Sequence, residues 1–185
     1  MTTKAEAILK EIENLSKEEF LPIIGPVKGK YLVETVKNHG AKRVLEVGAF
    51  IGYSAILMAG ALGTDGSIVT IEINPDSAAR ARENIEKAGL TRRIEVRTGN
   101  ALSVIPSLPD AFDMVFIDAQ KSEYLAYLKL AEAKLKKDGP VFADNVKIFA
   151  DQMRGYLDYV RNSGKYQSRY IDVGFDGVEI STKLF

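Results

Sequence analysis

Acidic and amide side chains follow two apolar segments of the chain, at the point where each segment ends. Asp118 ends the run Phe112–Asp118, and Asp144 ends the run Pro140–Asp144 with Asn145 directly after it. Both runs have the apolar composition of strands that are buried on both faces of a parallel sheet. The carboxyl ends of such strands meet at one edge of the sheet, where ligands bind in this type of fold. We therefore expect the three side chains to lie together.

Two carboxylates and an amide oxygen, with water completing the shell, are hard oxygen ligands that suit Mg²⁺ or Mn²⁺. Lys121 lies three residues after Asp118 and is expected to face the same cleft. An amine beside a divalent cation gives up its proton more readily, which makes Lys121 a candidate general base. The alternative is that Asp118 and Asp144 cap helices and Lys121 is a solvated lysine. Their clustering at adjacent strand ends favours a site.

A glycine turn lies earlier in the chain, between a short apolar run and a helix-like segment. The run Arg43–Val47 is followed by Gly48 and Gly52, and the segment Tyr53–Leu62 comes next. Strand, glycine turn and helix form the corner that cradles phosphates or nucleotides in α/β sheets. The spacing of the glycines matches neither G-x-G-x-x-G nor the P-loop pattern. This corner therefore predicts a nucleotide-type ligand without the usual dinucleotide fingerprint.

The second half of this unit is the expected strand Ser67–Ile73, which carries Glu72 near its end. An acidic residue about 20 positions beyond the glycine turn can accept hydrogen bonds from the two hydroxyls of a ribose. Glu72 could also be a solvated strand end, but the turn before it favours the ribose role. The predicted ligand is therefore a nucleoside, and the glycine pattern argues against a diphosphate.

The composition limits the remaining classes of function. The 185 residues are enough for one domain with a substantial core, 1–185, in which residues 1–26 form an N-terminal helix and connector. The chain has no cysteine and one histidine, so we expect neither a thiol nucleophile nor a histidine-based metal site. Basic and acidic residues number 25 each, which indicates no overall attraction to nucleic acid. No long apolar run or signal-peptide core is present, so we expect a cytoplasmic protein without a membrane span.

Helical and extended patterns alternate along the chain and predict its architecture. Helices are expected at 3–15, 28–38, 53–62, 75–87, 101–108, 122–137 and 149–162, and strands at 43–47, 67–73, 94–98, 112–118 and 140–144. Two alternating segments, 166–173 and 178–184, are joined by Gly-Phe-Asp-Gly and predict a closing hairpin. The fold class is therefore α/β and doubly wound.

Five segments resemble the catechol O-methyltransferase family, whose members depend on S-adenosylmethionine and magnesium. They are Leu45-Glu-Val-Gly-Ala-Phe-Ile-Gly-Tyr-Ser54, Thr70-Ile-Glu-Ile-Asn-Pro-Asp76, Asp113-Met-Val-Phe-Ile-Asp118 with Lys121, Ala143-Asp-Asn-Val146, and Asp176-Gly177. The resemblance extends from about residue 28 to the end. It implies a Rossmann-like class I methyltransferase fold, with a mostly parallel seven-stranded sheet and a C-terminal antiparallel hairpin. The implied activity is methylation of a hydroxyl on a small catechol-like or other vicinal-oxygen acceptor.

The resemblance also implies roles for individual residues. The methionine end of the cofactor is expected to contact Glu46, Gly48, Phe50, Tyr53 and Ser54. The ribose and adenine are expected to contact Glu72, Ile73, Asn100 and Ala101. The cofactor-binding set is completed by Ile24, Asp118 and Gln120. The implied magnesium ligands are Asp118, Asp144 and Asn145, the catalytic base is Lys121, and the acceptor is expected to contact Lys121, Asn145 and Tyr170.

Several features depart from the animal enzymes of that family, among them the loop after Asn145, Ala101 near the adenine, and two positions beside the acceptor. Gln120 replaces an aromatic residue beside the acceptor, and Tyr170 replaces a glutamate that touches it. The residues expected to bind the cofactor and the metal therefore match the family more closely than the residues expected to contact the acceptor.

Other functions compete with this interpretation. A transfer RNA methyltransferase of the same family is one alternative, because residues 147–169 hold five basic residues against two acidic ones. An ordinary solvated helix face explains those charges equally well. Further alternatives on this fold are a non-catalytic nucleoside-binding module and a nicotinamide-dependent enzyme. The sequence does not specify the acceptor or decide whether the protein is a homodimer.

Overall fold

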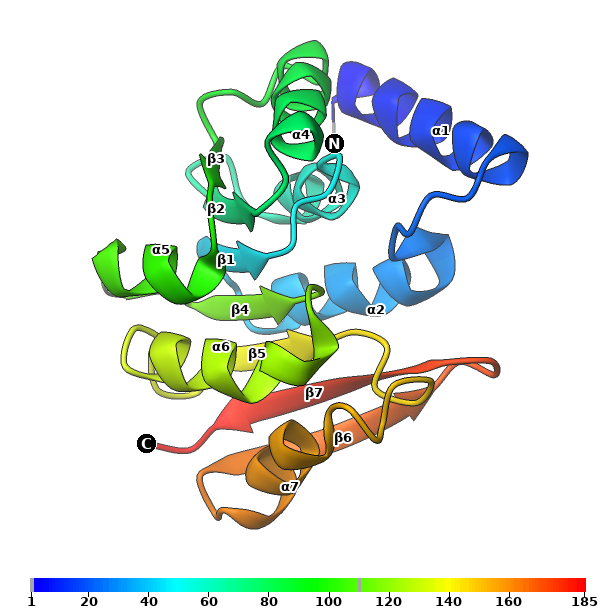
Figure 1. Cartoon of the computed structure of the whole chain (residues 1–185). Helices are drawn as coiled ribbons and strands as arrows, with labels where there is room; N and C mark the ends of the chain where they lie inside the picture. Colours follow the sequence, from blue (N-terminus) through cyan, green and yellow to red (C-terminus); the bar gives the residue numbers. More distant parts are fainter. Residues whose placement is uncertain (1, 110) are drawn as a thin grey trace.

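The computed structural model describes residues 2–109 and 111–185, which fold around one seven-stranded sheet (Figure 1). The strand order is β3-β2-β1-β4-β5-β7-β6. The first five strands are parallel, and β7 lies antiparallel to both β5 and β6. The predicted α/β sheet and its closing hairpin are therefore confirmed.

The bounds of the elements follow the sequence patterns closely in the first half of the chain. The helices are α1 (Thr3–Glu18), α2 (Gly25–Asn38), α3 (Tyr53–Ala61), α4 (Pro75–Lys87), α5 (Ala101–Ser107), η1 (a 3₁₀ turn, Lys121–Glu123), α6 (Tyr124–Glu132) and α7 (Arg154–Asn162). The strands are β1 (Arg43–Val47), β2 (Ser67–Glu72), β3 (Ile94–Thr98), β4 (Met114–Ile117), β5 (Pro140–Ala143), β6 (Tyr166–Asp172) and β7 (Gly177–Lys183).

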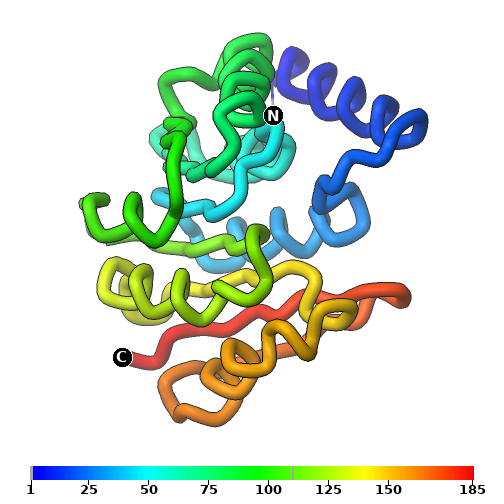
Figure 2. The backbone as a smooth tube through the Cα atoms, in the orientation of Figure 1, coloured from blue at the N-terminus to red at the C-terminus, as the bar shows by residue number. Residues whose placement is uncertain are grey.

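Helices cover both faces of the sheet and divide the core into two layers. Buried residues of α1, α2, α3 and α4 pack together on one face, whereas α5, α6 and α7 cover the other face. The central strands β1, β4 and β5 are buried on both sides, as parallel strands between helical layers must be. The backbone trace shows the C-terminal hairpin at one end of the molecule and α1 and α4 at the other (Figure 2).

Helices α6 and α7 differ most from the sequence prediction. Helix α6 ends at Glu132 rather than at 137, because the chain then forms a bridge between Leu135 and Phe112, just before β4. Helix α7 begins at Arg154 rather than at 149, because residues 146–153 form successive turns. A backbone hydrogen bond from Ile148 to the Asp176 carboxylate holds these turns to the closing hairpin. In both cases a tertiary contact overrides the helical pattern.

The end of β1 lies very close to the end of β4, so the glycine turn after β1 contacts Asp118. Gly48 has a φ of +101°, and a Cβ at this position would lie 2.0 Å from the carbonyl oxygen of Asp118. Only glycine can occupy such a position. The turn after β1 therefore lies directly against the end of β4, and the two predicted halves of the site are adjacent.

Candidate active site

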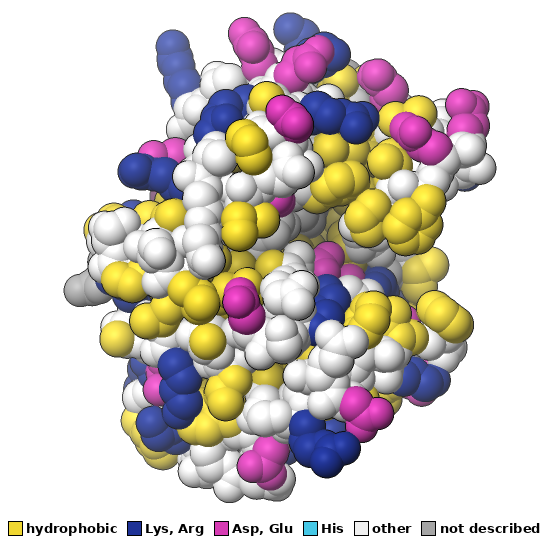
Figure 3. All heavy atoms as spheres, viewed as in Figure 1, with side chains coloured by type: hydrophobic (Ala, Val, Ile, Leu, Met, Phe, Trp, Pro, Cys, Tyr) yellow, Lys and Arg dark blue, Asp and Glu magenta, His cyan; other side chains and the backbone are white. Residues whose placement is uncertain are grey.

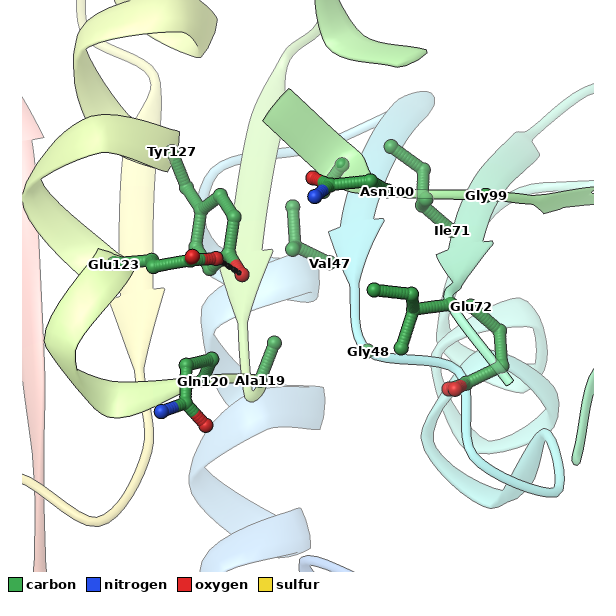
Figure 4. A pocket seen from close by; sticks show the side chains of 12 residues that line it. Val47, Gly48, Ile71, Glu72, Gly99, Asn100, Ala119, Gln120, Glu123 and Tyr127 are labelled. Carbon is green, nitrogen blue, oxygen red and sulfur yellow. Dashed lines mark hydrogen bonds between the residues drawn. The ribbon is translucent and has the colours of Figure 1, made fainter. Parts of the chain in front are cut away.

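A cavity of about 470 Å³ opens at the carboxyl ends of β1, β2 and β4 (Figure 4). Its lining includes six residues of the predicted cofactor set, namely Gly48, Glu72, Ile73, Asn100, Ala101 and Gln120. It also includes Glu123 and Tyr127 of η1 and α6, which the sequence analysis did not single out. The space-filling view shows the surface hollowed near the middle of this face, with hydrophobic side chains along its border (Figure 3).

Glu72 lies at one end of this cavity. Its carboxylate accepts hydrogen bonds from the backbone N–H of Phe50 at 2.7 Å and of Asn74 at 2.9 Å. These two bonds fix the carboxylate at the tip of β2 and tie it to the glycine turn. A carboxylate can accept about four hydrogen bonds, so lone pairs remain for the hydroxyls of a ribose.

A second, narrower hollow adjoins the cavity at Gly48. Its lining includes Ile24, Phe50, Tyr53, Ser54 and Asp118, all of which belong to the predicted cofactor set. The Tyr53 hydroxyl donates to Glu13 at 2.6 Å, so helix α1 is fastened to this end of the site. The predicted methionine-end residues are therefore grouped together and lie apart from the predicted adenosine end.

Glu46 lies at the carboxyl-end half of β1 and is completely buried. One carboxylate oxygen accepts a hydrogen bond from Ser54, and the other has no partner among the described residues. Burial raises the pKa of Glu46 to about 7, although the bond from Ser54 opposes the increase. Glu46 is thus an acid whose protonation changes near neutral pH, beneath the hollow that Ser54 lines.

The predicted metal ligands meet at the ends of β4 and β5, and a residue from α2 joins them. The ammonium of Lys28 lies 2.6 Å from one oxygen of Asp144 and 2.7 Å from the other. It also lies 2.9 Å from Asp176, which in turn accepts a hydrogen bond from the Asn145 amide at 2.7 Å. Because the amide nitrogen of Asn145 is held by Asp176, its oxygen is left for another partner.

The charges of this cluster suit a cation. Burial and the negative charge of Asp118 raise the pKa of Asp144 to about 7, while Lys28 opposes the increase. Two neighbouring carboxylates and a free amide oxygen are the hard donors that Mg²⁺ and Mn²⁺ prefer. No group of three or more acidic, histidine or cysteine side chains that could hold a metal occurs in the described part of the chain. The predicted donor set is Asp118, Asp144 and Asn145, in which Lys28 already holds Asp144. Its role as a metal site stays a prediction.

Lys121 is held between the acidic cluster and a buried tyrosine. Its nitrogen donates to Asp118 at 2.8 Å and to the Tyr124 hydroxyl at 3.0 Å. Tyr124 is fully buried, and its hydroxyl donates to the backbone carbonyl of Asp144. Burial raises the pKa of Tyr124 well above its usual value, so the hydroxyl stays protonated. The prediction that Lys121 faces the cluster is therefore confirmed, and Tyr124 sets its position.

Tyr170 lies farther along the same side, on β6. Its hydroxyl donates to Asp172 at 3.2 Å, and its ring lies against Gly177, beside Asp176. The Tyr170 ring thus lies near Asp176. Its hydroxyl donates to Asp172 on the same strand rather than to Lys121 or Asn145. Its role toward an acceptor stays a prediction.

No role was predicted for Lys28, Glu123 or Tyr127 from the sequence, and Asp176 entered only as part of a motif. Lys28 lies in an amphipathic helix and carries no local signal, because its partners are more than 100 positions away. Glu123 and Tyr127 have helical spacing, which is equally typical of ordinary packing.

The basic residues between 147 and 169 are mostly neutralised within the chain. Ion pairs join Lys147 to Asp172, Arg154 to Asp151, Arg161 to Glu179 and Lys165 to Glu132. Four of the five basic side chains therefore already have carboxylate partners, which weakens the case for a phosphate-binding surface.

The mostly parallel sheet, with a glycine turn after β1 and Glu72 at the tip of β2, defines a Rossmann-like α/β fold. A model of the O-methyltransferase family matches residues 1–154. Because that match covers most of the sequence, the chain belongs to the O-methyltransferase family.

Relatives and solved structures agree with this family. The chain is 39% identical to a catechol O-methyltransferase from Niastella koreensis over 76% of this chain and 66% of that protein. It is 28% identical to the O-methyltransferase from Bacillus cereus in complex with SAH, with a TM-score of 0.85 over 99% of this chain and 91% of that one. The O-methyltransferase TomG from Streptomyces achromogenes, in complex with SAM, gives a TM-score of 0.87 at 28% identity, over 96% and 90% of the two chains.

These matches confirm the class I methyltransferase fold. The chain spans about two thirds of the length of several catechol O-methyltransferases that it matches. None of the helices in the described residues is long and apolar enough to cross a membrane.

Proposed function

We propose that this protein transfers a methyl group from S-adenosylmethionine to a hydroxyl of a small catechol-like or other vicinal-oxygen acceptor, with Mg²⁺ or Mn²⁺ bound at Asp118, Asp144 and Asn145. Lys121 is the general base. The family and the SAM-bound and SAH-bound structures of similar proteins support the donor. The acceptor and the metal are proposed from the chemistry of the site.

The observation that carries the proposal is that Asp118 lies both in the lining of the narrow hollow and next to Lys121. This residue lines the hollow at the methionine end and also contacts the nitrogen of Lys121 at 2.8 Å. A base must lie within hydrogen-bonding reach of the proton that it removes. This contact supports a role for Lys121 at the end of the proposed cofactor site where a methyl group would be transferred.

The acceptor chemistry follows from this arrangement. A phenolic hydroxyl has a pKa of about 10 and is a poor nucleophile at neutral pH. Lys121 removes its proton, while Tyr124 and Asp118 keep the lysine nitrogen at one position. Asp118, Asp144 and Asn145 would hold the divalent cation, whose positive charge would stabilise the deprotonated oxygen of the acceptor. Positioning of the acceptor then provides a large part of the rate acceleration.

The ion pairs within residues 147–169 favour a small acceptor over transfer RNA. A nucleic-acid site needs several cations that are free to contact phosphates. Four of the basic residues here are already paired with carboxylates. The cluster around Lys121 likewise favours an enzyme over a module that only binds a nucleoside.

A product screen tests this function. The protein is incubated with S-adenosylmethionine and Mg²⁺, together with either a panel of catechols or total transfer RNA, and methylated products are identified by mass spectrometry. We expect methylated catechols and unmodified transfer RNA, and roughly 100- to 10,000-fold slower formation of product with Lys121→Ala. Methylated transfer RNA alone would support the second candidate, and binding of SAH without any product would support a nucleoside-binding module.

A further inference from the structure

The adenosine end of the cavity is mostly apolar and has few hydrogen-bonding side chains. Its walls include Val47, Ile71, Ile73, Ala101 and Ala119. An adenine ring carries one exocyclic amine, which needs an acceptor when it enters such a site, since an unpaired buried donor costs free energy. The polar side chains that line the cavity are Glu72, Asn100, Gln120, Glu123 and Tyr127.

Three of these side chains either already form other hydrogen bonds or have no close partner that fixes their position. Glu72 fixes the glycine turn and faces the ribose position. The side-chain oxygen of Asn100 accepts the backbone N–H of Leu102 at 2.8 Å and caps α5. Gln120 is exposed, and its amide makes only a 3.4 Å contact with Ser122.

Glu123 is different, because its carboxylate is held in the cavity wall. The hydroxyl of Tyr127, one helical turn later, donates to one oxygen of Glu123. Tyr127 is buried, and burial followed by the hydrogen bond to Glu123 raises its pKa, so its hydroxyl stays a donor. In Figure 4 both side chains lie across the cavity from Glu72 and Ile71. The second oxygen of Glu123 is thus a charged acceptor on the side of the cavity opposite the ribose position.

We propose that Glu123 accepts a hydrogen bond from the exocyclic amine of the adenine and thereby selects adenine over bases that carry a carbonyl at that position. The inference rests on the proposed function, because it assumes an adenosine-containing donor. A carboxylate accepts a hydrogen bond from an amine but repels a carbonyl oxygen, so it favours the amine at the position that faces it. Tyr127 acts as a positioning residue that keeps the Glu123 carboxylate in place.

Calorimetry with two ligands tests the inference. The ligands are S-adenosylhomocysteine and its analogue with an unsubstituted purine, in which hydrogen replaces the amine. We expect the wild type to bind the purine analogue about 10- to 100-fold more weakly, the range for a hydrogen bond to a charged group. In Glu123→Gln the ratio of the two dissociation constants should fall to within about threefold, because a glutamine amide can either accept or donate.

Two further variants serve as controls for this ratio. Glu72→Ala should weaken both ligands alike and leave the ratio unchanged, because it acts on the ribose. Gln120→Ala should also leave the ratio unchanged, and a ratio that collapses in this variant rather than in Glu123→Gln overturns the assignment. Thermal denaturation verifies that each variant is folded.

The outcomes separate the inference from the proposed function. If the wild type binds both ligands equally, Glu123 does not read the amine, whatever the variants do. If Glu123→Gln keeps the wild-type ratio, the amine is recognised by another group and the inference is wrong. If the wild type binds neither ligand, the proposed donor itself is wrong.

Discussion

The ammonium nitrogen of Lys28 lies 2.6 Å from a carboxylate oxygen of Asp144, although 116 positions separate the two residues in sequence. Only 14% of the Lys28 side chain and 2% of the Asp144 side chain are exposed. The same ammonium contacts Asp176, so a single lysine neutralises part of the charge of two buried carboxylates. The pair joins helix α2 to the ends of β5 and β7 and holds one of the proposed metal ligands.

Removal of this ammonium should destabilise the protein strongly. Lys28→Met leaves Asp144 and Asp176 without their cation, and breaking a buried ion pair from one side costs about 3–5 kcal/mol. Urea denaturation measures the change in the free energy of unfolding. The matched control is Lys30→Met on the same helix, where a 3.9 Å pair with Glu34 is exposed and the cost should stay below about 0.5 kcal/mol. Equal effects of the two substitutions would show that the Lys28 pair is not structurally important.

The protein should bind one divalent cation and require it for turnover. Asp118→Asn removes one of the two carboxylates of the donor set, so binding of Mn²⁺, measured by electron paramagnetic resonance, should weaken by at least about tenfold. Asp172→Asn is the control, because Asp172 is exposed and paired with Lys147 outside the donor set. Excess chelator should abolish methyl transfer, and added Mg²⁺ should restore it. Full activity of a protein that metal analysis finds empty would exclude the metal from the reaction.

Burial of Glu46 predicts that stability falls as pH rises toward neutrality. The folded pKa is about 7 and the ordinary value is 4.5, so between them the folded state binds more protons than the unfolded state. The contribution of Glu46 to the free energy of unfolding is therefore complete below about pH 4.5 and is lost as the pH rises through 7. The free energy of unfolding should fall by about 3 kcal/mol over this range. The raised pKa of Asp144 adds a change of the same sign.

Glu46→Gln should remove this part of the pH dependence. Chemical denaturation at pH 5 and pH 8 should give a smaller difference in unfolding free energy for the variant than for the wild type. Glu95→Gln is the control, because Glu95 is exposed and forms an ion pair with Arg97. A difference that is the same in all three proteins would assign the pH dependence to other groups.

The sheet could be predicted from local patterns because each parallel strand is a short apolar run between polar breaks. The start of α4 could also be predicted, since Asn74 caps the helix and Pro75 occupies its first position. The end of α6 and the start of α7 could not be predicted. Both depend on contacts with distant segments, the bridge between Leu135 and Phe112 and the bond from Ile148 to Asp176.

The residues of the site also fall into those that local sequence patterns predict and those that depend on distant contacts. Glu72, Asp118 and Asp144 could be found because strand ends in a parallel sheet share one edge, whatever the helices do. Lys28 could not be found, because its place in the site depends on how α2 lies against the ends of β5 and β7. Glu123 and Tyr127 have only the spacing of helical neighbours, and their place in the cavity wall follows from the packing of α6.

Glu72 should hold the ribose of the donor. Glu72→Ala should weaken binding of S-adenosylhomocysteine by about 1.5–3 kcal/mol, the range for the loss of hydrogen bonds to a charged group. The substitution should have less effect on an analogue without the two ribose hydroxyls, because that ligand has no bonds to lose. Calorimetry on both ligands separates this role from a general loosening of the turn at Phe50, which would weaken both equally.

Lys121 provides the sharpest test of the mechanism. If it is the general base, Lys121→Ala should lower kcat roughly 100- to 10,000-fold, the usual contribution of acid–base catalysis. The affinity for the donor should stay nearly constant, because the base meets the acceptor. The loss should be smaller for acceptors whose hydroxyl is already acidic, such as a nitro-substituted catechol, since less proton abstraction is then needed.

The measurement compares kcat of the wild type and of Lys121→Ala on acceptors whose hydroxyl pKa values span several units. A ratio near one across the series would mean that Lys121 only supports Asp118 and Tyr124, its two partners in the structure. A large ratio that is independent of acceptor pKa would indicate that the lysine orients the acceptor through a hydrogen bond. A ratio that falls steadily as the acceptor becomes more acidic is the result that general-base catalysis requires, because only the proton transfer depends on that pKa.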